Sequence, residues 1–128
     1  MAESEKITIN LSAVDLGRID LLVDQGHFSN RTDFIRNAIR TKLMGYENNI
    51  QEVVTRRSMA VGVLMYSKGD LLKWQAKGEM RKLAIMGMLI LGSDITPELA
   101  LATIESVNVS GVFRASDEVK KALADRTH

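Results

Sequence analysis

The most informative stretch of the chain, residues 6–40, reads KITINLSAVDLGRIDLLVDQGHFSNRTDFIRNAIR. Its first six residues alternate polar and apolar side chains, which is the period of a strand with one buried face. Two segments with apolar residues at helical spacing follow, and Gly26 lies between them. The pattern therefore predicts a strand over 6–11, a helix that begins after Ser12, a tight turn, and a second helix capped by Asn30.

A lone strand with one apolar face is unstable, and about 45 residues cannot close a core around two helices. Two chains satisfy both needs if their strands pair antiparallel into a ribbon and four helices pack beneath it. One face of the ribbon and one stripe of the second helix then form a shared dimer core. The side chains that we expect in this core are Ile7, Ile9, Leu11, Ile35 and Ile39.

The opposite face of such a ribbon presents Lys6, Thr8 and Asn10. A two-stranded ribbon fits the major groove of double-stranded DNA, where Lys matches guanine acceptors and Asn matches adenine. Thr can contact several base edges or the thymine methyl group. We predict base contacts for these three residues; the alternative is that they form the solvated side of an edge strand.

The N-terminus of the second helix is the other expected contact with DNA. Its unpaired backbone N–H groups and positive dipole end are suited to a phosphate. The predicted phosphate contacts are Ser29, Asn30, Arg31 and Thr32. Arg36 and Arg40, four residues apart on an exposed face, fit solvated side chains or ion pairs with a neighbouring helix better than base contacts.

These residues resemble the ribbon-helix-helix family, the fold of the Arc and methionine repressors and of CopG-type regulators. The resemblance rests on Lys6-Ile-Thr-Ile-Asn-Leu11 and on Phe28-Ser-Asn-Arg-Thr-Asp-Phe-Ile-Arg-Asn-Ala-Ile-Arg40, and it covers roughly residues 5–44. It implies a homodimeric bacterial transcription regulator, a repressor, whose strands enter the groove while the second helix clamps phosphates.

The rest of the chain predicts an α+β protein with a second domain. Residues 1–45 form the DNA-binding domain in this interpretation, 46–57 a connecting helix, and 58–128 a small C-terminal domain. A weak repeat of about 24 residues aligns Gly87 with Gly111, and Gly62 fits with a one-residue shift. Each copy reads as a strand, a turn and a short helix, so both a stacked β-α array and a compact α/β sandwich fit.

The middle of the chain is rich in methionine and also holds Tyr66 and Trp74. These groups fit a core, or an adaptable surface for self-association or for a small apolar effector. The C-terminal domain is therefore expected to oligomerise the protein, to a tetramer or beyond, or to sense an effector. The three repeated glycines indicate bulges or close strand packing.

Composition limits the other function classes. The chain has 128 residues, no cysteine, two histidines, and 17 basic against 16 acidic residues. We therefore expect no metal site and no cofactor, and the absence of a nucleophile-base set or phosphate loop argues against an enzyme. No secretory signal or membrane span is expected, which favours the cytoplasm. The near-neutral charge keeps an alternative open: a structural or antitoxin-like interaction module that uses the ribbon for dimerisation.

Overall fold

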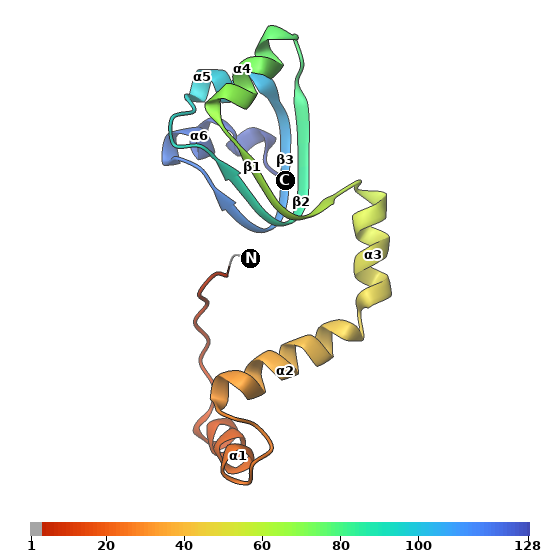
Figure 1. Cartoon of the computed structure of the whole chain (residues 1–128), viewed down its shortest axis with the longest axis vertical. Coiled ribbons are helices and arrows are strands. Elements are labelled where there is room, and N and C mark those ends of the chain that lie inside the picture. Colours follow the sequence, from red (N-terminus) through yellow and green to blue (C-terminus); the bar gives the residue numbers. More distant parts are fainter. Residues whose placement is uncertain (1–3) are drawn as a thin grey trace. The chain divides into compact units, whose positions relative to one another are not determined.

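The computed structural model describes residues 4–128, which form a mixed α+β structure (Figure 1). Their contacts divide them into an N-terminal unit, residues 6–53, and a C-terminal unit, residues 54–128 with Glu5. None of the helices within the described range is long and apolar enough to cross a membrane. The predicted domain boundaries, after residues 45 and 57, stay predictions.

The N-terminal unit starts with residues 6–11, which form neither helix nor strand in the single chain. A strand requires a hydrogen-bonded neighbour, and no described residue pairs with this segment. The predicted strand therefore stays a prediction about the assembled protein. Helix α1 (Ala13–Asp24) follows, and its predicted N-cap is confirmed because Ser12 Oγ accepts a hydrogen bond from the Asp15 backbone N–H at 3.1 Å.

The turn between the first two helices depends on Gly26. Its φ of 83° lies in the left-handed region that glycine enters without strain, as the sequence predicts for the end of α1. Helix α2 (Arg31–Met44) begins after the predicted cap Asn30, whose side-chain oxygen accepts from the Asp33 N–H at 2.8 Å. Helix α3 (Glu47–Arg56) then occupies the segment in which we expect a connecting helix.

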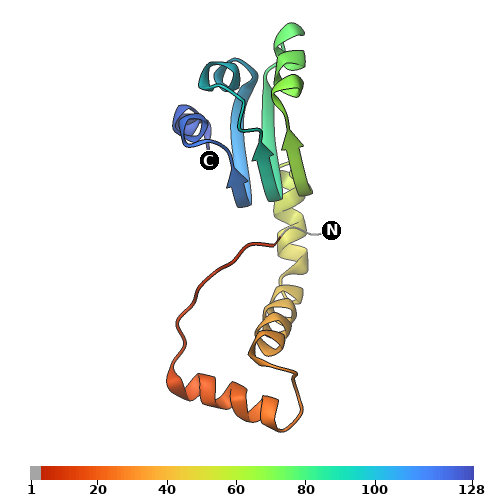
Figure 2. The same ribbon diagram turned by 60° about the vertical axis from the view of Figure 1, so that its left-hand side comes forward.

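The C-terminal unit consists of three successive strand-helix pairs. The elements are β1 (Ala60–Tyr66), α4 (Lys68–Ala76), β2 (Arg81–Leu91), α5 (Pro97–Thr103), β3 (Ile104–Arg114), α6 (Asp117–Ala122) and a short 3-10 helix (Ala124–Arg126). The strands are parallel and lie side by side in the order β1-β2-β3 (Figure 2). Successive strand-helix pairs are common to both predicted arrangements, the stacked β-α array and the compact α/β sandwich; we call the three pairs the β-α array.

Each helix of the array begins at a side-chain cap. Ser67 and Asp70 form a capping box at α4, in which each side chain accepts a hydrogen bond from the backbone of the other. Thr96 caps α5 and is followed by Pro97 at the first helical position, and Ser116 caps α6. The sequence predicts these two helix starts from Asp94 or Thr96 before Pro97 and from Ser116-Asp117-Glu118; Thr96 and Ser116 are the caps that form.

All three helices cover the same face of the sheet. Side chains alternate between the two faces of a strand, and one set faces the helices. The resulting core joins strand residues such as Leu83, Ile85, Leu89 and Val107 to side chains of all three helices, among them Leu71, Trp74, Leu99, Ala100, Val119 and Leu123. Trp74 is therefore a core residue, packed edge to face on Tyr66 with 4.8 Å between ring centroids.

Three glycines form a ladder across the centre of this sheet. Gly62 pairs with Gly87, and Gly87 pairs with Gly111, so the glycines of the sequence repeat are direct neighbours. Their φ angles are 122°, 139° and 129°. A Cβ on Gly87 would overlap the carbonyl oxygen of Gly62, and one on Gly111 would overlap that of Gly87. Gly87 and Gly111 therefore serve close strand packing, one of the two predicted roles, whereas nothing lies within 4 Å of the position of a Gly62 Cβ.

Candidate nucleic-acid interface

An apolar groove lies between the N-terminal segment and helices α1 and α2. Its volume is about 360 Å³. Four of the five residues predicted for the dimer core line it, namely Ile9, Leu11, Ile35 and Ile39, together with Ile19, Leu22 and Phe34. The fifth, Ile7, does not line this groove and is 73% exposed in the single chain.

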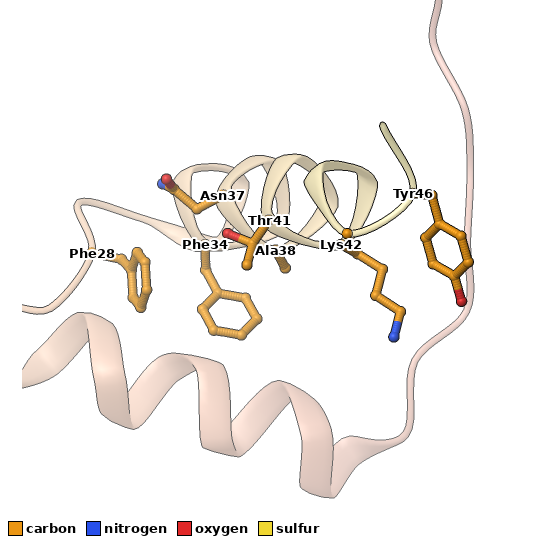
Figure 3. A pocket seen from close by; sticks show the side chains of 8 residues that line it. Phe28, Phe34, Asn37, Ala38, Thr41, Lys42 and Tyr46 are labelled. Carbon is orange, nitrogen blue, oxygen red and sulfur yellow. The ribbon is translucent and has the colours of Figure 1, made fainter. Parts of the chain in front are cut away.

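A second groove runs along α2 beside the first (Figure 3). Phe28 and Phe34 meet edge to face at its start, with 5.0 Å between ring centroids, and Phe34 points toward α1. Tyr46 lies at its far end. Phe34 and Ala38 line both grooves, so these two side chains of α2 separate them.

The N-terminal unit buries little of its apolar surface. Within residues 6–53, Ile19 is the one buried side chain. Large apolar residues of the N-terminal segment, of α1 and of α2 stay exposed, including Ile9, Leu21, Ile39 and Leu43. A unit of this size with one buried side chain lacks the apolar burial that stabilises a fold.

The predicted base contacts all lie in the segment before α1. Lys6, Thr8 and Asn10 are exposed, and within residues 4–128 none of them forms a side-chain hydrogen bond or an ion pair. They alternate with Ile7, Ile9 and Leu11, of which Ile9 and Leu11 line the apolar groove. The structure thus leaves these polar groups open without assigning them a role.

Three of the four predicted phosphate contacts lie together in the structure, and the fourth, Arg31, does not lie with them. Ser29, Asn30 and Thr32 line a polar cleft of about 340 Å³ at the start of α2. Two backbone N–H groups near this cleft are already used: that of Ser29 donates to the Asp33 carboxylate at 3.0 Å, and that of Asp33 donates to Asn30. The first two helical N–H groups, of Arg31 and Thr32, have no intrahelical acceptor by geometry and remain for a ligand.

Arg31 does not line the cleft, because its guanidinium holds Asp20 of α1. Its Nε and Nη2 atoms donate to the two carboxylate oxygens, each at 2.9 Å. This bidentate hydrogen bonding lowers the pKa of Asp20 from its ordinary value and raises that of Arg31. The pair ties α1 to α2 across eleven positions of sequence, and its intramolecular role was not foreseen from the sequence.

Arg36 and Arg40 line the same cleft as Ser29, Asn30 and Thr32. The salt bridges of the described residues include neither arginine and both are exposed, so of the two predicted alternatives the single chain has the solvated side chains and not the ion pairs. Their spacing of four residues places both guanidinium groups on one side of α2. These two cationic side chains were not predicted from the sequence as phosphate contacts, although they line the same cleft as three residues that were.

One comparison with known proteins bears on this arrangement. A model of the ribbon-helix-helix transcriptional regulator family matches residues 2–120, which is most of the chain. The chain belongs to this family. The comparisons with curated proteins and with solved structures give no match. The family match extends well past residues 5–44, on which the resemblance rests, and covers most of the C-terminal unit.

The charge of the regulator's N-terminal unit is distributed unevenly. The unit, residues 6–53, contains six basic and six acidic side chains; all six bases but only four of the acids lie within residues 6–45. Two acids are paired internally, Asp15 with Arg18 and Asp20 with Arg31. The cleft at α2 holds two arginines and one acid, Asp33, whose oxygens accept from Ser29 and Asn37. Within residues 4–128 no cluster of three or more His, Asp or Glu could hold a metal ion.

Proposed function

We propose that this regulator binds DNA as a homodimer. Residues 6–11 of two chains pair antiparallel into a ribbon that lies in the major groove, where Lys6, Thr8 and Asn10 contact bases. Bound at a site that overlaps a promoter, the dimer represses transcription. The observation that carries the proposal is the exposed apolar surface of the N-terminal unit, which surrounds the groove lined by Ile9 and Ile39.

A second copy of the same unit is the partner that this surface needs. Burying one Leu or Ile side chain stabilises by about 1.5–3 kcal/mol, so four such residues per chain contribute on the order of 10 kcal/mol. That amount is comparable with the whole stability of a small domain. Because the polar and apolar residues of 6–11 alternate, pairing that buries Ile9 leaves Thr8 and Asn10 on the opposite face.

The polar cleft at the start of α2 supports the proposed phosphate contact. Arg36, Arg40 and the free N–H groups at the helix start supply positive charge and hydrogen-bond donors in one place. Ser29, Asn30 and Thr32 add side-chain donors. We assign Arg31 to the same clamp only after its release from Asp20, since the two carboxylate contacts occupy its planar donor face.

The alternative function is an interaction module that dimerises without reading DNA. The Asp20–Arg31 pair and the carboxylate of Asp33 favour it, because both reduce the positive charge available to phosphates. The two functions differ in a salt titration, since phosphate contacts release counterions and make DNA affinity fall steeply with salt.

Selection of bound fragments from random double-stranded DNA by the purified full chain tests the proposal. We expect enrichment of a two-fold symmetric site, as a symmetric dimer requires, and an affinity that falls as salt rises. Arg36→Ala and Arg40→Ala should each weaken binding to all sequences about equally and reduce the salt slope by about one. Absence of enrichment at low and at physiological salt would favour the interaction module.

A further inference from the structure

The sheet of the C-terminal unit has a second face that the helices do not cover. On β1 this face presents Val61, Val63 and Met65; on β2 it presents their register partners Met86, Met88 and Ile90. We call these six residues the outer patch. All six are apolar, and none belongs to the core that joins the sheet to its helices.

Exposure in the single chain is highest along β1. Val61 is 65% exposed, Val63 46% and Met65 67%, whereas Met88 at the centre of the sheet is 5% exposed. Parallel sheets are found almost always with both faces covered, and their strands are apolar on both sides for that reason. The strand β1, AVGVLMY, fits that description and carries no charge that would keep it in water.

We propose that the outer patch packs against the same patch of a second copy of this chain, within the dimer formed by the N-terminal units. The proposal rests on the homodimer argued above and adds a second contact to it. A symmetric contact requires a self-complementary surface, and an uncharged apolar patch meets that requirement. The nearest charge on β3, Arg114, is already paired with Glu5 at 2.6 Å.

The size of the patch selects a tethered partner over a free one. Two strands about 4.8 Å apart and five residues long give a flat area on the order of 200 Å². An interface between freely diffusing proteins buries about 800 Å² on each partner. The patch is therefore too small to join separate molecules. Two copies tethered through α3, which is about 15 Å long, face one another at an effective concentration in the roughly millimolar range.

Methionine oxidation tests whether the patch is covered. Met65 is 67% exposed in the single chain and Met80, in the turn before β2, is 48% exposed. If a second copy covers the patch, dilute peroxide should oxidise Met65 several-fold more slowly than Met80 in the native full-length protein. Equal or faster oxidation of Met65 would overturn the proposal. The unfolded protein supplies the control, in which both rates should be equal.

A single introduced cysteine tests whether a second copy of the chain covers the outer patch. The chain has no cysteine, so Val63→Cys introduces a unique thiol in the patch, and Lys121→Cys on the exposed side of α6 serves as the matched control. A short bismaleimide should join two chains through position 63, at a rate that does not change with protein concentration, and should not join them through position 121. Protection of Met65 without this cross-link would mean that another part of the same chain covers the patch, which overturns the proposal.

Mass and DNA binding measured on the same wild-type sample separate the two proposals. A dimer that binds DNA while Met65 oxidises freely contradicts only the outer-patch contact. A monomer that binds no DNA contradicts the proposed function and removes the basis for the contact.

Discussion

Glycine at position 87 is required by its neighbours as well as by its backbone. The strand passes this residue with a φ of 139°, and a methyl group there would overlap the Gly62 carbonyl oxygen. Gly62 has a similar φ of 122°, yet nothing lies within 4 Å of the position where its Cβ would be. Gly62 therefore needs glycine only for its positive φ, whereas Gly87 needs glycine both for its positive φ and for the space beside it.

Gly87→Ala should destabilise the protein more than Gly62→Ala. Both substitutions place alanine in a backbone region that costs about 1–3 kcal/mol. Gly87→Ala adds an overlap in a packed sheet, worth roughly another 1–3 kcal/mol. Chemical denaturation of the two variants measures the difference in the free energy of unfolding. Equal losses for both would show that the ladder does not depend on close packing of the strands.

At the scale of elements, the pair of Asp20 and Arg31 links α1 to α2. Hydrogen bonding to Arg31 lowers the pKa of Asp20 in the folded protein from its ordinary value of 3.8. A carboxylate with a lowered folded pKa stabilises the fold above its unfolded pKa, and this contribution is lost as the pH falls through the folded pKa. The pair therefore contributes at neutral pH and not in strong acid.

Asp20→Asn should consequently have opposite effects on stability and on DNA binding. The free energy of unfolding should fall at neutral pH, and the difference from wild type should shrink below pH 3.8. Affinity for DNA of any sequence should rise, because one acid is removed and Arg31 is released to phosphates. Asp24→Asn is a matched control that removes an acid of the same helix without touching Arg31. Equal DNA affinities for both variants would exclude a phosphate role for Arg31 that Asp20 restrains.

Local signals explain why so many element ends could be predicted. Ser12, Asn30, Thr96 and Ser116 each act on an N–H group two or three residues away, so the information lies within one turn of sequence. The repeat of glycines also revealed which strands are equivalent. Neither signal distinguishes a stacked array from a sandwich, because the order of parallel strands is set by contacts between distant residues.

The candidate site was harder to predict for the same reason. The Asp20–Arg31 pair joins residues of two helices, and only the crossing of those helices brings them within 2.9 Å. The place of Arg36 and Arg40 beside Ser29 and Thr32 follows from the helical period and could have been found from the sequence. The predicted strand over 6–11 requires a partner strand from a second chain, so contacts within one chain do not contain it.

For the whole molecule, the proposal makes dimerisation depend on one face of residues 6–11. Ile9→Asp would place a carboxylate in the shared core, which costs several kcal/mol when the charge has no partner. Thr8→Asp adds the same charge on the opposite face and is the matched control. Sedimentation should show a loss of dimer for Ile9→Asp and an intact dimer for Thr8→Asp. Equal behaviour of the two variants would contradict the predicted ribbon.

Reading of DNA by the ribbon is the central claim, and the affinity of Asn10→Ala for the selected DNA site tests it most directly. Loss of the contact between Asn and a base should weaken binding to that site by about 1–3 kcal/mol and leave binding to unrelated DNA and dimer mass unchanged. Titration of wild type and variant against both DNAs at one salt concentration gives the four affinities that are needed. A variant that binds the selected site as tightly as wild type would contradict the claim.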